Sequence, residues 1–252
     1  MLGVVIPHYS KRLHLKRAVA SVKPFKTVVV DDSLDGGVQI EGATVLRTSG
    51  QQGFARAANV GLQELSRQGF QLALVLNDDA VMHPGSIDEL LSAWSNTDGA
   101  LAPVLYEPAG AIHGISVSKW GRVRLNHQPG DAQALSGACM LMRSTERFDP
   151  SYVHGFEDVE LCRRLRSRGL TIRVIENSGC DHQGGGSVDR RSRSAQRAAM
   201  SGHLRYLGGG FRGGIAVGLG VAQVLSEGAS LPRFMGIFDG IRDHLKDRYR
   251  LN

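Results

Sequence analysis

Short apolar runs, each followed by residues with helical spacing, form the clearest pattern in the N-terminal part of the chain. The runs are Gly3–Ile6, Thr27–Val30 and Leu72–Leu76. After the first run, Leu13, Val19 and Val22 recur at roughly helical spacing. Apolar strands that alternate with helices are typical of a parallel sheet covered on both faces, because such strands are buried on both sides. The pattern predicts a doubly wound α/β fold.

Acidic residues follow two of these runs directly. Asp31 and Asp32 come after the second run, and Asn77, Asp78 and Asp79 come after the third. Ligands bind at the carboxyl ends of strands in such sheets. One or two carboxylates there commonly hold Mg²⁺, whose coordination shell is completed by substrate phosphates. Because Asp and Asn also favour turns and helix caps, the pattern alone leaves both interpretations open.

A second acidic cluster precedes another helix-like stretch. Glu157, Asp158 and Glu160 lie just ahead of Leu161–Leu165, which places them in the first turn of a predicted helix. The helix dipole favours negative charge there by about 0.3 to 1 kcal/mol. That effect is a complete structural explanation of the cluster.

Five ordered motifs together resemble those of the family 2 glycosyltransferases, particularly the bacterial rhamnosyltransferase-like branch. The motifs are Val5–Tyr9, Val28–Ser33, Gly53–Gly61, Leu76–Asp79 and Gly155–Leu161. The resemblance covers roughly Met1 to Tyr206. It implies a GT-A fold, with a Rossmann-like, mostly parallel sheet flanked by helices, and transfer of a sugar from a nucleotide donor with inversion at the anomeric carbon.

The resemblance also implies a set of donor-binding residues. It assigns the base and ribose to Pro7, Tyr9, Asp31 and Asp32. A carboxylate can accept a hydrogen bond from the N3–H of uracil or thymine, or from ribose hydroxyls. The remaining donor-binding positions are Gly53, Arg56, Asn59, Asn77 and Asp78. A solvated helix face is the alternative explanation for Arg56.

For the metal, the resemblance implies a divalent cation, Mg²⁺ or Mn²⁺, bound by Asp79. Asp181–Ser187 resembles the histidine–glycine segment of the family, in which the histidine, here His182, completes the metal shell. A lone histidine is more often structural. The basic stretch beyond contains Arg190, Arg191, Arg193 and Arg197, which either neutralise a pyrophosphate or an anionic lipid acceptor or form a solvated helix face.

The resemblance makes Asp158 the expected general base and Glu157 the fallback for that role. A sugar hydroxyl is a poor nucleophile at neutral pH, so a carboxylate within hydrogen-bond reach must take its proton as the new bond forms. The segments Ser136–Cys139 and Gly155–Phe156 are expected to form a wall of the acceptor pocket.

The resemblance and a change in composition divide the chain into two expected parts. The resemblance implies that residues 1–206 form the catalytic domain, with a nucleotide-sugar half at 1–100 and an acceptor half at 101–206. Residues 207–252 form a helical tail, in which a Gly-rich apolar run, Gly213–Leu225, precedes a basic segment. The run is too short and interrupted to span a membrane. The tail is expected either to lie on the inner face of the plasma membrane or to pack against the catalytic domain or a second subunit.

The overall charge and the cysteines further limit the class of protein to which the chain can belong. The net charge of +6 and the pI near 9.5 suit an anionic partner, but no nucleic-acid-binding module accompanies the charge. The three cysteines form no CxxC pair, so neither zinc nor a disulfide framework is indicated. The first strand begins at the N-terminus, which predicts no targeting segment and a cytoplasmic location.

Two other functions compete with this interpretation. A sugar-nucleotide pyrophosphorylase needs a Gly-rich, Arg-containing loop after the first strand, whereas this chain has Pro7–Ser10 there. A non-catalytic nucleotide-binding protein is expected to lack an acid at Asp79 or Asp158, and both are present. The prediction is therefore an inverting glycosyltransferase that uses a UDP- or dTDP-linked sugar and acts in the synthesis of a cell-surface polysaccharide, glycolipid or glycosylated metabolite.

Overall fold

The computed structural model describes residues 1–9, 12–34, 37–152, 155–183, 192–208, 210–226 and 230–250. Its elements are β1 (Leu2–His8), α1 (Arg12–Ser21), β2 (Lys26–Asp31), β3 (Ala43–Arg47), α2 (Phe54–Arg67), β4 (Leu72–Leu76), β5 (Ala80–Met82), α3 (Ser86–Ala93), β6 (Asp98–Glu107), β7 (Gly110–Ile112), β8 (Ile115–Val117), β9 (Val123–Leu125), β10 (Cys139–Arg143), α4 (Glu157–Ser167), β11 (Thr171–His182), α5 (Arg193–Leu207), α6 (Gly210–Ser226) and α7 (Leu231–Arg250).

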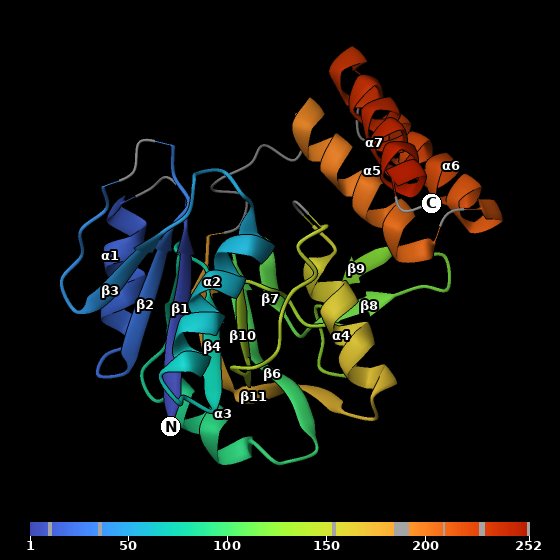
Figure 1. The fold of residues 1–252 in the computed structure, drawn as a ribbon. Coiled ribbons are helices and arrows are strands. Elements are labelled where there is room, and N and C mark those ends of the chain that lie inside the picture. The colour runs from blue at the N-terminus through green and yellow to red at the C-terminus, as the bar shows by residue number, and fades with distance from the viewer. Residues whose placement is uncertain are drawn as a thin grey trace.

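A curled central sheet carries the fold (Figure 1). Its strand order is β3-β2-β1-β4-β10-β6-β11-β5, and β7 pairs with β6. Strands β3, β2, β1, β4, β6 and β11 all point the same way, and β10 runs antiparallel between β4 and β6. The α/β class and the mostly parallel sheet expected from the sequence are confirmed.

Helices cover both faces of this sheet, which explains the continuous apolar runs. Along β1, Val4 and Ile6 join a core cluster with residues of α1 and α3. Val5 between them points the other way, into a second cluster with residues of α2 and α4. All three side chains are fully buried. A strand with this environment has no polar face, so its sequence does not alternate between apolar and polar residues.

Glycines set the distance between α2 and the sheet. A Cβ added at Gly61 would lie 2.3 Å from Val5 Cγ1 and 3.2 Å from Val30 Cγ2. At Gly3 the opposing atoms are those of Leu65, the nearest at 2.5 Å. The backbone of α2 therefore rests directly on β1, and this contact fixes where the N-terminus of α2 meets the ends of the strands.

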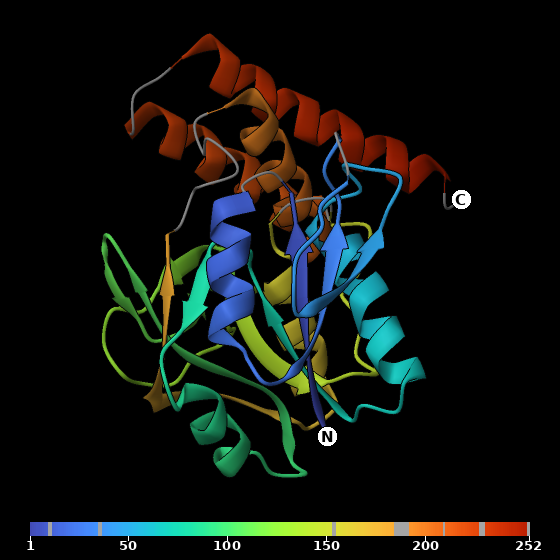
Figure 2. The same cartoon turned by 90° about the vertical axis from the view of Figure 1, so that its left-hand side faces the viewer.

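The three C-terminal helices form a separate layer beyond the carboxyl ends of the parallel strands (Figures 1 and 2). Their apolar cluster joins Met200 and Leu204 of α5 to Ala216 and Val224 of α6 and Ile237 of α7. Helix α5 thus packs with the tail, so the helical layer begins upstream of residue 207, where the sequence places the start of the tail. No helix in the described ranges has both the length and the apolar character needed to cross a membrane.

We expect Gly61→Ala to destabilise the protein by about 1 to 3 kcal/mol, because β-branched valines on strands have little room to move away from the new methyl group. Urea unfolding followed by circular dichroism measures the change. Gly218→Ala on α6 is the matched control, since a Cβ there meets nothing within 4 Å. An equal response of the two variants would contradict the close packing of α2.

Candidate active site

The start of β5 and the ends of β6 and β11 bring Asp79, Glu107 and His182 together. Strand β11 runs parallel to β6, so His182 at the end of β11 lies beside Glu107 at the end of β6. Strand β5 pairs with β11 on the other side, with Ala80 opposite His182. The Nδ1 atom of His182 is 2.8 Å from Glu107 Oε1, and its Nε2 atom is 3.2 Å from Asp79 Oδ1. The imidazole therefore lies between two carboxylates.

Charges within this group reinforce one another. Burial opposes the charged imidazolium, but hydrogen bonds and attraction from Asp79 and Glu107 outweigh it and raise the pKa of His182. Burial likewise opposes ionisation of Asp79, and contact with His182 lowers the pKa of that carboxyl group. The site thus favours a positive charge beside Asp79, and a bound cation is able to take the place of a proton on Nε2.

The geometry of Asp79 and His182 fits a divalent cation. Two neighbouring ligands of an octahedral ion with bonds of about 2.1 to 2.2 Å are about 3 Å apart, close to the 3.2 Å between Asp79 Oδ1 and His182 Nε2. A carboxylate behind the second ring nitrogen, as Glu107 provides, is the usual support of a metal-binding histidine. Within the described residues, no three His, Cys, Asp or Glu side chains gather into one shell. The remaining positions would be filled by water or phosphate oxygens.

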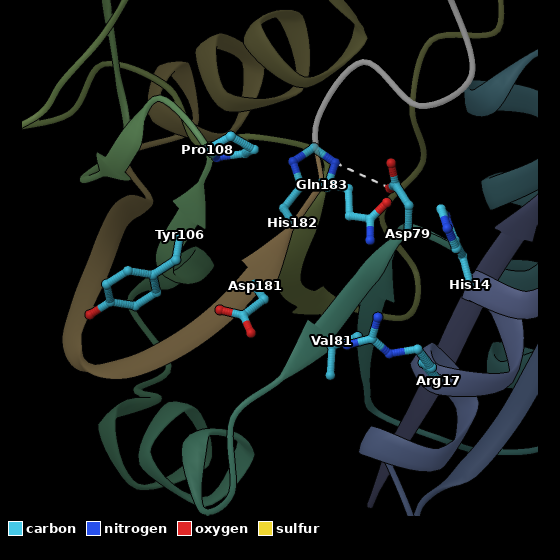
Figure 3. Close-up of a pocket in the computed structure, with 9 residues that line it drawn as sticks. All are labelled: His14, Arg17, Asp79, Val81, Tyr106, Pro108, Asp181, His182 and Gln183. Atoms are coloured by element: carbon cyan, nitrogen blue, oxygen red, sulfur yellow. Dashed lines mark ion pairs between the residues drawn. The ribbon is translucent and has the colours of Figure 1, made fainter.

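A pocket of about 280 Å³ opens beside this pair (Figure 3). The lining residues are His14, Arg17, Asp79, Val81, Tyr106, Pro108, Asp181, His182 and Gln183. His14 and Arg17 extend from α1 on the side of Asp79 away from His182. The Nδ1 atom of His14 is buried and has no hydrogen-bond partner among the described residues. Arg17 gives this side of the pocket a positive charge, and the His14 ring adds a nitrogen able to form a hydrogen bond, which suits an anionic group.

Asp78 connects two strand ends. Its Oδ2 atom lies 2.6 Å from His8 Nδ1 and accepts a hydrogen bond of 3.2 Å from the backbone N–H of Tyr9. The Asp78 carboxyl group is buried, whereas Tyr9 is exposed. Asp78 therefore holds the segment after β1, with Pro7 in the strand and Tyr9 at its end, against the end of β4.

Asp31 and Asp32 organise the loops next to this segment. Asp31 accepts hydrogen bonds from both the N–H and the hydroxyl of Ser33. Burial opposes its ionisation, but these bonds and one from Val38 outweigh that effect and lower the pKa of Asp31. Asp32 accepts bonds of 2.9 Å from the backbone N–H groups of Gln52 and Gly53. Both carboxylates therefore shape the loops around β2 and the start of α2, and their contact with a donor stays a prediction.

Asn59 and Arg56 of α2 contact a neighbouring loop. The Asn59 amide donates to the Phe148 carbonyl at 2.8 Å and accepts from its N–H at 2.9 Å. Arg56 is exposed and lies 3.4 Å from the Pro150 carbonyl oxygen. Asn59 thus clamps the backbone at Phe148. These hydrogen bonds form without a nucleotide-sugar donor, and the expected contact of Asn59 with the sugar-phosphate stays a prediction.

The acid pair lies at the N-terminus of α4. The Oδ2 atom of Asp158 accepts a hydrogen bond of 2.9 Å from the Gly137 N–H. The adjacent Ala138 carbonyl accepts one of 2.8 Å from the Asn77 N–H. The segment Ser136–Cys139 therefore connects Asp158 to the strand end that carries Asp79, and the two acidic groups border the same region.

The two carboxyl groups of this pair differ in proton affinity. Burial raises the pKa of Glu157 to about 8, and the charge of Asp158 adds to the shift. The Oε2 atom of Glu157 has no hydrogen-bond partner within the described residues. Burial also raises the pKa of Asp158, but the N–H groups of Gly137 and Val159 stabilise its charge. A proton shared by the pair is therefore favoured on Glu157, and a negative charge is favoured on Asp158.

Helix α5 supports the turn that presents these acids. Phe156, just before Glu157, has a φ of 71°, a left-handed conformation that is unfavourable for a non-glycine residue. Its ring stacks on His203 with centroids 5.3 Å apart and lies 5.8 Å from the ring of Tyr206. His203 in turn has its Nε2 atom 2.8 Å from the Trp120 carbonyl oxygen. These contacts with α5 hold the strained turn in place.

Two arginines of the basic stretch pair with acids of the C-terminal helices. Arg193 pairs with Asp239 of α7 at 2.6 Å, and Arg197 pairs with Asp243. Residues 184–191, which include Arg190 and Arg191, lie outside the described residues. Sequence reasoning missed Glu107, His14 and Arg17. Glu107 ends an apolar strand as the other acids do, and this position is the signal by which it could have been found. For His14 and Arg17 the sequence carries no comparable signal.

The chain matches no known protein-family model and no curated protein sequence. Solved structures of similar shape include GalNAc-T7 with UDP, GalNAc and Mn²⁺, at a TM-score of 0.63 and 14% identity, covering 82% of this chain and 47% of that one. The mannosyltransferase PcManGT from Pyrobaculum calidifontis, in complex with GDP-Man and Mn²⁺, matches at 0.58 and 12% over 98% of this chain and 87% of that one. TarS 1-349 from S. aureus, in complex with UDP-GlcNAc, matches at 0.58 and 13% over 97% and 80%.

At these identities the likenesses show the fold, which is the GT-A type expected from the sequence. The chain spans about half the length of GalNAc-T7. The rhamnosyltransferase-like branch of family 2 is not addressed by these matches and stays a prediction.

Glu157 should make the stability of the protein depend on pH. Because its pKa is about 8 in the folded chain and 4.5 ordinarily, the folded state keeps a proton that the unfolded chain releases between those values. Stability conferred by this protonation is present at low pH and is lost as the pH rises toward 8. In Glu157→Gln this loss should disappear, so the melting temperature of the variant should rise relative to wild type from about pH 5 to about pH 8.

Glu41→Gln, at an exposed position before β3, is the matched control for this titration. Thermal unfolding by differential scanning calorimetry across the pH range gives the comparison. A constant offset between wild type and Glu157→Gln would rule out the raised pKa.

Proposed function

We propose that this chain is an inverting glycosyltransferase, dependent on a divalent cation, that moves a sugar from a UDP- or dTDP-linked donor to an acceptor hydroxyl. The observation that carries the proposal is the connection of two chemical centres. The Asp79 and His182 pair suits a cation, and the backbone of Gly137 and Ala138 joins it to the acid pair at the start of α4. Transfer of a glycosyl group needs both centres side by side.

On the donor side, Asp79 and His182 would hold Mg²⁺ or Mn²⁺, with Glu107 keeping the imidazole in place. A bound divalent cation supplies Lewis-acid stabilisation of the diphosphate that leaves. Arg17 borders the same pocket and offers further positive charge to phosphate oxygens, and His14 beside it offers a hydrogen bond. Asp78 positions the exposed Tyr9 near the strand ends, where we assign the nucleoside.

On the acceptor side, Asp158 would act as the general base. As the acceptor oxygen bonds to the anomeric carbon, the bond from that carbon to the phosphate oxygen breaks, and the acceptor proton passes to Asp158. Its hydrogen bond from Gly137 fixes the carboxylate, and the proton on Glu157 keeps a second negative charge away from it. Attack from the face opposite the leaving group gives inversion.

The neighbours in fold support this choice of donor class. GalNAc-T7 is described with UDP, TarS with UDP-GlcNAc and PcManGT with GDP-Man. Each of these three structures contains a nucleotide or a nucleotide sugar, and two of them contain Mn²⁺. We extend the donor class to this chain and retain UDP and dTDP as its nucleotides. A role in cell-surface polysaccharide, glycolipid or glycosylated-metabolite synthesis remains part of the proposal.

Removal of either cation ligand should abolish cation-dependent nucleotide binding. In Asp79→Ala and His182→Ala, titration calorimetry should show no Mn²⁺-dependent binding of UDP or dTDP. Glu107→Gln, which keeps the volume but weakens the support of the histidine, should lower the affinity for Mn²⁺ about 10 to 100-fold.

Asp181→Asn is the matched control, because this exposed carboxylate lines the same pocket but pairs with His83 at 2.8 Å. It should bind the nucleotide as wild type does. The cation assignment is wrong if EDTA and Asp79→Ala both leave nucleotide affinity unchanged.

Asp158→Asn should lower turnover by about 10² to 10⁴ while preserving donor affinity, since the substitution removes the proton acceptor and keeps the side-chain shape. Initial rates of nucleotide release with an active acceptor, together with donor titrations, separate the two effects. Glu157→Gln keeps that side chain neutral and should retain most of the turnover. A larger loss in Glu157→Gln than in Asp158→Asn would exchange the roles of the two acids.

A further inference from the structure

Helix α7 turns a row of apolar side chains outward. Leu231, Met235, Phe238 and Leu245 are exposed and three, four or seven residues apart, the spacing of one helix face. The exposed fraction is 73% for Leu231 and 67% for Phe238. Single exposed apolar residues are ordinary on protein surfaces, but a contiguous row on one helix marks an interaction site.

The opposite face of α7 is fully occupied by α5. A Cβ at Gly236 would lie 2.5 Å from the Arg193 carbonyl oxygen, and one at Gly240 would lie 2.6 Å from that of Arg197. Ile237 between them is buried in the cluster of the helical layer. The two glycines allow the helices to approach closely, so α7 is held rigidly with its apolar row facing away from α5.

Acidic and basic side chains of α7 lie on different faces of the helix. Asp239 and Asp243 point toward α5, where they pair with Arg193 and Arg197. Arg242 and Lys246, in contrast, are exposed, and Arg242 also contacts Asp239 at 3.0 Å. The outward face thus combines apolar side chains with cations, while Asp239 and Asp243 are neutralised on the inner side.

Helix α6 also exposes apolar side chains and a cation. Phe211 and Leu225 are exposed, at 82% and 60%, and Arg212 is the sole charged residue in the helix. Ala216 and Val224 face the cluster shared with α5 and α7. On both helices, therefore, the exposed charged side chains within the described residues are cations.

We propose that the outward face of α7, with the exposed apolar residues of α6 beside it in the same helical layer, docks on the surface of an anionic lipid bilayer. Apolar side chains enter the boundary between headgroups and acyl chains, and the neighbouring cations lie at the depth of the lipid phosphates. No described helix is able to cross the bilayer, so the layer lies on it.

A second copy of the chain fits this face less well. A two-fold symmetric dimer pairs a surface with itself, so Arg242 and Lys246 would face a surface whose exposed charged side chains, among the described ones, are also cations. Asp239 and Asp243, which could relieve this repulsion, are turned toward α5. Charge complementarity therefore favours an anionic surface. The inference concerns the helical layer alone and does not rest on the proposed transferase activity.

Cosedimentation of the full-length protein with sucrose-loaded vesicles tests the proposal. The protein should bind vesicles that contain phosphatidylglycerol, bind pure phosphatidylcholine vesicles more weakly, and release as salt increases. Phe238→Glu should weaken binding at least about tenfold, because it removes a phenyl ring from the apolar row and adds a negative charge. Lys246→Gln should weaken it about fivefold.

Leu13→Glu is the matched control, because this α1 side chain is 70% exposed but lies outside the helical layer. It should bind vesicles as wild type does. Thermal unfolding checks that Phe238→Glu remains folded, as expected for an outward side chain. The proposal is overturned if wild type ignores anionic vesicles at low salt, or if Phe238→Glu and Leu13→Glu behave alike. A concentration-dependent dimer in sedimentation velocity that Phe238→Glu abolishes would assign the face to a second copy instead.

Discussion

The position of His182 between the carboxylates of Glu107 and Asp79 is the constraint on which the site depends. Three partly buried groups of this kind are tolerated best when their charges compensate, because an unpaired charge inside a protein is unfavourable. A positive charge on or beside the imidazole meets that requirement. The same requirement fixes the ends of β5, β6 and β11 relative to one another, since a shift of one residue along any of these strands would turn its side chain to the opposite face of the sheet.

Around this group, the fold uses polar side chains to hold its strand ends rather than leaving them free for a ligand. Asp78 ties β4 to β1, and Asp32 ties the end of β2 to the start of α2. Asn59 clamps the backbone at Phe148. A site built on rigid strand ends is preorganised, so little conformational freedom has to be lost when a ligand arrives. The exposed Tyr9 is positioned by groups of this kind.

The helical layer serves both sides of this architecture. Toward the sheet, α5 stacks His203 and Tyr206 against Phe156 and so supports a left-handed residue immediately before the acid pair. Away from the sheet, the face of α7 is apolar and cationic. Because α5 and α7 are joined by the close glycine contacts and by two ion pairs, whatever the outer face binds lies one rigid helix away from the turn that presents Glu157 and Asp158.

The sequence by itself determined the α/β class, the strands of the N-terminal half and the acidic residues at strand ends, because burial on both faces and the end of a buried strand leave direct marks in the order of residues. The resemblance carried by its ordered motifs also predicts roles for Asp79, His182, Glu157 and Asp158, and these roles stay predictions. Tertiary structure alone decided which of these residues meet. Glu107 joins His182 through the parallel register of β6 and β11, and His14 and Arg17 join through the packing of α1. Helix α5 packs with α7 on one side and contacts the turn before α4 on the other. Such pairings depend on the long-range register of strands and the contacts of helices, and residues far apart in the chain carry no local signal of either.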